Sequence, residues 1–204
     1  GLYLQVTRGV ARRDHPFPKH TKPSLSMTVC AAKFPKLHEV RDGVKVMTRP
    51  DERWARCDIK SIALLANVLA KQEASSKACR EAWLIKPNGD ISEGAVSNAF
   101  IINAEGSVVT HPADAHILPG ITRDVLLVLA RANGITVEER PFSQQEAMEA
   151  QEAFLTSTSA NVLPITSIDG KPVGNAKPGK VTRKLSALYA QHVEMQTGYA
   201  PPIS

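Results

Sequence analysis

The clearest structural signal in the chain is the segment RWARCDIKSIALLANVLAKQEA, residues 53–74. Its second half repeats apolar residues at the spacing of one helix face. The residues concerned are Ile62, Leu64, Leu65, Val68 and Leu69. This stripe predicts an amphipathic helix that docks on a sheet, with Asp58 or Ser61 as its N-cap. Lys60 then lies at the start of that helix.

Strand and helix patterns continue on both sides of this segment. Runs of β-branched and apolar residues predict strands at residues 3–8, 25–32, 44–47, 82–85, 99–102, 107–110, 135–137 and 152–156. Helical spacing predicts helices at about 121–133 and 181–196, and a capping box that begins at Ser143 predicts another. Because the order lacks a regular βαβ rhythm, we expect an α/β or α+β domain with a mixed sheet.

The composition weighs against several kinds of protein. Of the 204 residues 43% are hydrophobic, enough for one sizeable core, yet no apolar run approaches the length of a membrane span. The net charge is +5, but aromatics are 5% and are not interleaved with the basic residues, which disfavours a nucleic-acid partner. A basic pocket for a small anionic substrate fits this charge. The three separated cysteines argue against a disulfide framework and favour a reduced, cytoplasmic setting.

Two residues have the chemistry that an aldehyde cofactor needs. Lys60, if partly desolvated where the helix meets the sheet, would have a lowered pKa and a lone pair free to attack an aldehyde. Glu93 could face a pyridine nitrogen and keep that nitrogen protonated. The ordinary alternatives are a solvated surface lysine and a turn acid before a strand.

Two further segments could bind a phosphate group. Residues 118–123, LPGITR, open a predicted helix, where free N–H groups and the helix dipole attract anions. Residues 156–161, TSTSAN, leave a strand with four hydroxyl side chains. Their ordinary interpretations are a helix cap and a hydroxyl-rich turn. Together with Lys60 and Glu93, they supply the parts that a phosphorylated aldehyde cofactor requires.

Basic side chains supply candidates for substrate binding. Arg8, Arg13 and His15 lie in an early loop. Such residues are usually solvent-exposed, but an arginine there could grip a carboxylate through two parallel hydrogen bonds. Arg53, just before Lys60, could support the site. The histidines and cysteines lack metal-ligand spacing, so no metal site is predicted.

Four separated motifs, in the same order, resemble those of D-amino-acid aminotransferases. Residues 53–61 and 70–74 resemble the segment that carries the catalytic lysine in that family. Residues 92–98 resemble its segment for the cofactor nitrogen, and residues 120–123 and 156–158 resemble its phosphate-binding segments. By this resemblance the chain is identified as a member of the fold-type IV pyridoxal-phosphate enzymes, in the D-amino-acid aminotransferase branch.

The resemblance implies a pyridoxal 5'-phosphate cofactor and a set of site residues. Lys60 and Glu93 are the implied catalytic residues, with Lys60 forming the Schiff base and Glu93 facing the ring nitrogen. The early loop resembles that branch's substrate loop, which implies that Arg13 and His15 bind the substrate carboxylate, with Ser159 also at the substrate. The other implied cofactor contacts are Arg53, Ser97, Asn98, Leu118, Gly120, Ile121, Thr122, Ser157 and Thr158.

The implied reaction converts D-alanine and 2-oxoglutarate into pyruvate and D-glutamate in a homodimer. Branched-chain aminotransferases and aminodeoxychorismate lyase share this fold and remain alternatives, as does a non-catalytic basic binding module. The resemblance makes residues 1–33 the end of a smaller α+β domain whose front section is missing. Residues 34–40 are then an interdomain linker, and residues 41–204 are the large cofactor-binding domain. Val96 departs from the family, which often has a serine there.

Overall fold

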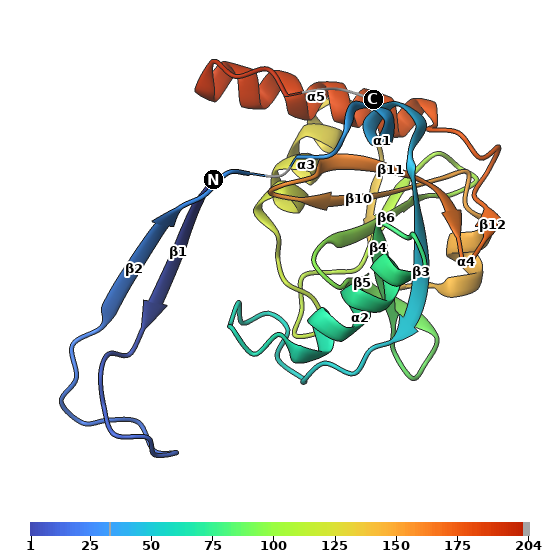
Figure 1. The fold of residues 1–204 in the computed structure, drawn as a ribbon. Helices are drawn as coiled ribbons and strands as arrows, with labels where there is room; N and C mark the ends of the chain where they lie inside the picture. Colours follow the sequence, from blue (N-terminus) through green and yellow to red (C-terminus); the bar gives the residue numbers. More distant parts are fainter. Residues whose placement is uncertain (33, 202–204) are drawn as a thin grey trace. The chain divides into compact units, whose positions relative to one another are not determined.

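The structure is a computed structural model that describes residues 1–32 and 34–201. It divides into two compact units, Gly1–Phe34 and Pro35–Ser204. In the smaller unit, β1 (Leu2–Thr7) pairs antiparallel with β2 (Ser24–Val29), as Figure 1 shows. Apolar side chains of both strands are exposed, among them Leu4, Val6 and Met27. A two-stranded hairpin by itself has no second layer that could cover them.

A ten-stranded mixed sheet forms the larger unit (Figure 1). The strand order is β8-β7-β6-β10-β11-β3-β4-β5-β9, and β12 pairs with β11. Pairing is parallel at β7–β8, β11–β3 and β3–β4 and antiparallel elsewhere in the sheet. The predicted mixed-sheet α+β fold is therefore confirmed. The strands are β3 (Val44–Pro50), β4 (Glu81–Ile85), β5 (Asp90–Gly94), β6 (Asn98–Ile102), β7 (Val108–Thr110), β8 (Val137–Glu139), β9 (Phe142–Ser143), β10 (Glu152–Ser157), β11 (Asn161–Ile168) and β12 (Lys171–Pro172).

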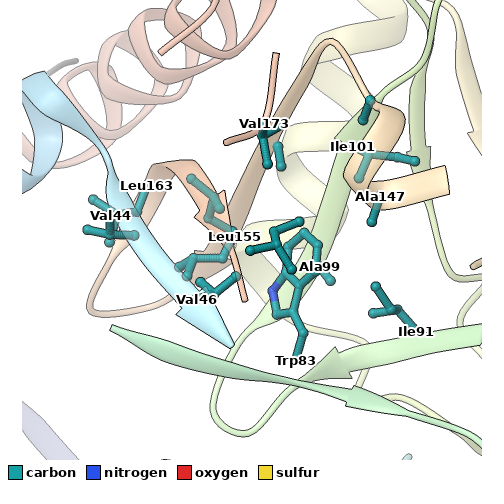
Figure 2. Close-up of a cluster of buried hydrophobic side chains, with 14 of the residues drawn as sticks. Val44, Val46, Trp83, Ile91, Ala99, Ile101, Ala147, Leu155, Leu163 and Val173 are labelled. Atoms are coloured by element: carbon teal, nitrogen blue, oxygen red, sulfur yellow. The ribbon is translucent and has the colours of Figure 1, made fainter. Parts of the chain in front are cut away.

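Alternation along β6 divides the core into two clusters, because successive strand residues point to opposite faces. Phe100 and Ile102 pack on one face with residues of α3 (Ile121–Ala132) and α5 (Lys180–Thr197). On this face the rings of Phe100 and Phe154 stack with their centroids 4.6 Å apart. Ala99 and Ile101 point to the other face, where Figure 2 shows Ala99 near Trp83 and Ile101 near Ala147. Burial on both faces explains why residues 99–102 of β6 are all apolar.

The shorter helices flank this second cluster. α1 (Leu37–Asp42) contributes buried Val40, and α4 (Gln144–Glu149) contributes buried Ala147. α1 begins inside the stretch 34–40 that was predicted as a linker. At the start of α4 the hydroxyl of Ser143 accepts a hydrogen bond from the Glu146 N–H at 3.1 Å, which confirms the predicted cap. None of the helices in the described ranges has both the length and the apolar character that a membrane crossing needs.

The helix predicted from the opening segment differs from α2 (Leu65–Ser76) in its start and in its buried face. Its buried residues are Ala70 and Ala74, which pack with Met47 and Leu84. Small alanine side chains let the helix backbone approach β4 closely. The larger apolar residues, predicted to face the sheet, instead point to solvent. They are Ile62, Leu64, Leu65, Val68 and Leu69, with Ile62 73% and Leu65 71% exposed.

The predicted N-caps of this helix are also wrong. The residue before α2 is Leu64, so the helix starts several residues after Lys60. Asp58 is instead paired with Arg56, whose Nε lies 2.8 Å from Oδ1 of Asp58. The hydroxyl of Ser61 accepts a long hydrogen bond of 3.4 Å from the Ala63 N–H. Both side chains therefore make local bonds, and residues 59–64 form an irregular loop instead of the first helical turn.

Candidate active site

The β5–β6 hairpin places Glu93 and Asn98 side by side in the interior. Glu93 is 5% exposed. Its Oε2 accepts a hydrogen bond of 2.9 Å from Nδ2 of Asn98, which also donates to the Leu118 carbonyl at 2.8 Å. Oε1 of Glu93 accepts from the Leu118 N–H at 3.1 Å. The hairpin and the loop before α3 are thus joined at one buried carboxylate.

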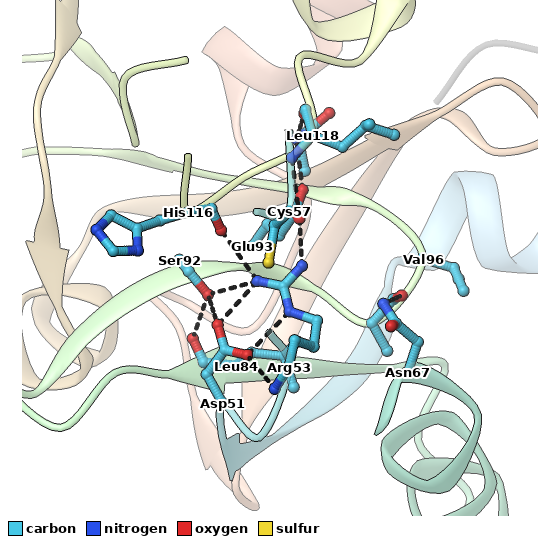
Figure 3. A network of polar contacts seen from close by, with 12 residues as sticks. Asp51, Arg53, Cys57, Asn67, Leu84, Ser92, Glu93, Val96, His116 and Leu118 are labelled. Carbon is cyan, nitrogen blue, oxygen red and sulfur yellow. Dashed lines mark hydrogen bonds and ion pairs between the residues drawn. The ribbon is translucent and has the colours of Figure 1, made fainter. Parts of the chain in front are cut away.

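Arg53 is the counter-ion of that carboxylate. Its Nη1 forms an ion pair with Oε1 of Glu93, and its side chain is 6% exposed. Nη2 donates to the His116 carbonyl at 3.1 Å and to Oδ2 of Asp51 at 2.8 Å. Figure 3 shows the guanidinium between Asp51 on one side and Glu93 on the other. Burial lowers the pKa of Arg53, but hydrogen bonds and charges of both carboxylates outweigh it and raise the net value.

The pKa of the Glu93 carboxyl group lies near neutral pH. Burial raises the pKa of Glu93 to about 7, and the negative charge of Asp51 adds to the effect. The charge of Arg53 and the Leu118 N–H act in the opposite direction without cancelling it. A carboxyl group of this kind can take or release a proton at physiological pH, which is typical of functional sites.

The start of α3 lies against Asn98. The N-cap is Gly120, and within the described ranges no side chain caps this end, so its first N–H groups are available to an anion. A Cβ atom at Gly120 would lie 2.2 Å from Oδ1 of Asn98. Any larger residue at this position would therefore force Asn98 or the start of α3 to shift. Ile121 is exposed and Thr122 is buried.

The turn between β10 and β11 lies at the same end of β6, because Thr156 pairs with Asn98 across the sheet. Oγ1 of Thr156 is buried and has no hydrogen-bond partner among the residues described. The hydroxyl of Ser157 accepts from the Ala160 N–H at 3.1 Å, and Thr158 and Ser159 are exposed. Two donor-rich segments therefore flank Asn98, which suits a phosphate group.

Lys60 is exposed, so its predicted desolvation is wrong for this structure. The reason is the late start of α2, which leaves the lysine in a loop without a helix to cover its four-carbon stem. The loop itself is anchored near the site. The Cys57 N–H donates to the Ala115 carbonyl at 2.8 Å, and Arg53 bonds Glu93.

Ser97 does not join the Glu93 cluster. Its hydroxyl donates to Oε2 of Glu81 at 2.9 Å, and the Val96 N–H lies 3.3 Å from the same oxygen. Glu81 is buried at the start of β4, where the strand pattern gave no reason to look for a functional acid. Glu81 thus braces the turn between Glu93 and Asn98.

Asp51 and Ser92 were also missed by the sequence analysis. The Ser92 hydroxyl donates to Oδ2 of Asp51 at 2.7 Å. A sequence signal exists in hindsight, because each of these residues lies within two positions of a predicted site residue, Arg53 or Glu93. Their pairing across 41 positions of the chain, however, is a tertiary contact.

Two of the predicted substrate residues, Arg13 and His15, belong to the hairpin unit. Arg13 and His15 are exposed. Nearby, the guanidinium of Arg8 lies 3.5 Å from the centroid of the Phe17 ring. Their role in carboxylate binding stays a prediction. In the described part of the chain, no group of three histidine, cysteine or acidic side chains is arranged to hold a metal ion.

Known proteins resemble this chain over most of its length. The family model for amino-transferase class IV matches residues 1–168. D-alanine aminotransferases of Bacillus licheniformis and Staphylococcus haemolyticus are 40% and 38% identical, each over 97% of this chain and 69% of its own length. The solved branched-chain aminotransferase of Thermobaculum terrenum in its PLP form superposes with a TM-score of 0.76 at 30% identity. That alignment covers 88% of this chain, which spans 59% of the length of that relative.

Proposed function

Because the chain belongs to the class IV aminotransferase family, we propose that it acts as a pyridoxal-phosphate-dependent D-amino-acid aminotransferase. The reaction would convert D-alanine and 2-oxoglutarate into pyruvate and D-glutamate. The main observation behind this proposal is the buried carboxylate of Glu93. It is paired with Arg53 and flanked by two segments that suit a phosphate. The D-alanine aminotransferases among the relatives support the choice of substrate.

The residues present fit the cofactor at both of its ends. Oε2 of Glu93 accepts one hydrogen bond from the described residues, so it can accept another from a protonated ring nitrogen. At the other end, the N–H groups of Ile121 and Thr122 and the hydroxyls of Ser157 and Thr158 would hold the phosphate. When bound, the cofactor supplies an electron sink for the pair released as the substrate Cα–H bond breaks.

Glu93 keeps the ring nitrogen protonated in this proposal. A carboxylate beside that nitrogen stabilises its positive charge. Asn98 fixes Glu93 through Nδ2, and the close approach of Gly120 fixes Asn98 in turn. Contacts from Glu93 through Asn98 to Gly120 therefore connect the carboxylate at the ring nitrogen with the proposed phosphate site.

Lys60 is the proposed covalent anchor and proton carrier. Its Nζ would hold the cofactor at the aldehyde carbon, with the aldehyde oxygen released as water, and as a free amine it would accept the proton of the substrate Cα. Arg13 and His15 are proposed to bind the substrate carboxylate, and Ser159 is proposed to contact the substrate. An ammonium in water is a poor nucleophile, so this role requires that Lys60 be covered when the site is complete.

A homodimer is part of the same proposal. The loop before α2 and the outer face of the helix leave large apolar side chains in solvent. Exposed apolar surface of this extent usually marks an interface. A second copy of the chain would bury it and bring cover to the neighbourhood of Lys60. The residues concerned are Trp54, Ile59, Ile62, Leu64, Leu65, Val68 and Leu69.

Addition of pyridoxal phosphate tests the proposal directly. The chain should develop a visible absorbance band that borohydride bleaches, and D-alanine should convert the loaded form to its amino form. Branched-chain aminotransferase is the second candidate, favoured by the solved relatives. Turnover of L-leucine in preference to D-alanine would select it. A chain that takes up no cofactor would support the binding-module alternative.

A further inference from the structure

We propose that Asp51 is a positioning residue that holds Arg53 in place and supplies the second negative charge which lets the cluster balance a protonated ring nitrogen. The inference rests on the proposed function, in which Glu93 faces that nitrogen. Nothing in the family motifs quoted above includes Asp51. Asp51 contacts Arg53 and Ser92, and it acts on Glu93 through Arg53.

The carboxylate of Asp51 holds one edge of the Arg53 guanidinium through two of its nitrogens. Oδ1 of Asp51 accepts from Nε of Arg53 at 2.9 Å, and Oδ2 accepts from Nη2 at 2.8 Å. The Ser92 hydroxyl donates to Oδ2 at 2.7 Å and holds the carboxylate from behind. A planar guanidinium gripped by two parallel bonds cannot rotate. Nη1 is therefore the group that remains to meet Glu93.

The three charged side chains of the cluster have a net charge of one negative unit. Ionised Asp51 and Glu93 contribute two negative charges and Arg53 contributes one positive charge. Side chains of Arg53 and Asp51 are only 6% and 11% exposed, so solvent screens this excess poorly. A proton on the ring nitrogen would bring the total to zero. Without Asp51, the pair of Arg53 and Glu93 would already be neutral, and the same proton would leave a buried positive charge.

The other groups packed around the cluster do not change its net charge. Burial raises the pKa of the Cys57 thiol, which keeps it neutral. Asn98 contributes an amide, and His116 and Leu118 contribute backbone groups. Asp51 also helps to raise the pKa of Glu93, whereas the Arg53 charge lowers it. The two acids therefore act together against the single arginine.

The test replaces Asp51 by its uncharged isostere in the full chain. Pyridoxal phosphate labelled with 15N in its ring reports directly whether the bound nitrogen carries a proton. In the unaltered protein we expect a protonated nitrogen at about pH 7.5, and in Asp51→Asn we expect its proton affinity to fall by roughly tenfold or more. Asp42→Asn is the matched control, because Asp42 also pairs with an arginine but is exposed. It should leave the spectrum unchanged. Equal protonation in Asp51→Asn and the unaltered protein would overturn the proposal.

A second measurement separates this inference from the proposed function. The ionisation of Glu93 can be followed by NMR in the ligand-free chain, where removal of the Asp51 charge should shift it to lower pH. If the unaltered protein binds no cofactor or leaves the nitrogen unprotonated, the proposed function fails, whereas the Glu93 titration still reports on Asp51. An unmoved titration overturns the role of Asp51. If Asp51→Asn does not fold, Ser92→Ala should cause a smaller shift in the same direction, and no shift would overturn the proposal.

Discussion

Asn98 and Gly120 approach each other so closely that a Cβ atom on the glycine would lie 2.2 Å from Oδ1 of the asparagine. The contact joins two functions that are far apart in the sequence. Asn98 positions the carboxylate of Glu93, and Gly120 begins the helix whose N–H groups face the proposed phosphate. One tight contact thus sets the distance between the two ends of the proposed cofactor site.

Gly120→Ala should disturb both ends of the site together. The added methyl group must push Asn98 or the start of α3 away, at a cost of about 1–3 kcal/mol in stability. We expect the affinity for pyridoxal phosphate to fall by roughly tenfold, because the donors no longer converge. Fluorescence or absorbance titration of the purified variant measures this. Unchanged affinity would mean that the loop adjusts and that the close approach has no functional role.

Glu93→Gln should change how stability depends on pH in the ligand-free protein. The folded pKa of Glu93 is about 7, above the value for an unfolded chain. The folded state therefore binds more protons between about pH 4.5 and 7, so this residue's contribution to the free energy of unfolding falls as pH rises through that window. The total change is about 3 kcal/mol and levels off above pH 7. Glutamine should abolish it.

Urea unfolding of both proteins at about pH 5 and pH 7.5 measures the difference. Glu105→Gln is the control, because Glu105 is exposed in the turn before β7. That variant should follow the unaltered protein at both values. Parallel curves for Glu93→Gln and the unaltered protein would show that burial of Glu93 carries no such penalty.

Lys60→Ala should remove the cofactor bond and leave the fold intact. The side chain is exposed, so we expect a stability change within about 0.5 kcal/mol. Borohydride treatment followed by mass analysis of peptides should locate the cofactor on residue 60 in the unaltered protein and nowhere in the variant. Lys171→Ala, also at an exposed position, is the control and should be labelled normally. Labelling that persists in Lys60→Ala would assign the anchor to another lysine.

Leu65→Glu should break the proposed homodimer. The substitution puts a charge on an apolar face that a second copy would bury, and an unpaired buried charge is strongly unfavourable. Light scattering coupled to size exclusion should show a shift from dimer to monomer. Met195→Glu is the control, because Met195 is 88% exposed on α5, away from this face in the sequence. If both variants keep the dimer, its interface lies elsewhere.

Arg13→Ala should weaken substrate binding more than cofactor binding. Loss of a bond between charged groups costs about 1.5–3 kcal/mol, so we expect the KM for D-alanine to rise by roughly tenfold or more. Arg12→Ala, one position earlier in the same loop, is the matched control. An equal effect of the two substitutions would point to the general charge of the loop, and an equal loss of cofactor would point to a structural role.

Features encoded by near neighbours were predictable from the sequence. α3 was expected at 121–133 and runs from Ile121 to Ala132, because helical spacing and the following glycine are local signals. The cap at Ser143 is likewise formed by a residue three positions away. The mixed sheet followed from the order of such segments. The family could be identified from four motifs that are each made of residues close together in the sequence.

Features that depend on distant partners required the folded chain. α2 turns its alanines inward, where they pack with Met47 of β3 and Leu84 of β4, and its larger apolar residues outward. Lys60 is exposed for the related reason that the helix begins too late to cover it. Ser97 binds Glu81, and Asp51 meets Ser92, only after the sheet has set its register. Local propensity selects the elements, whereas burial and charge pairing are properties of contacts across the chain.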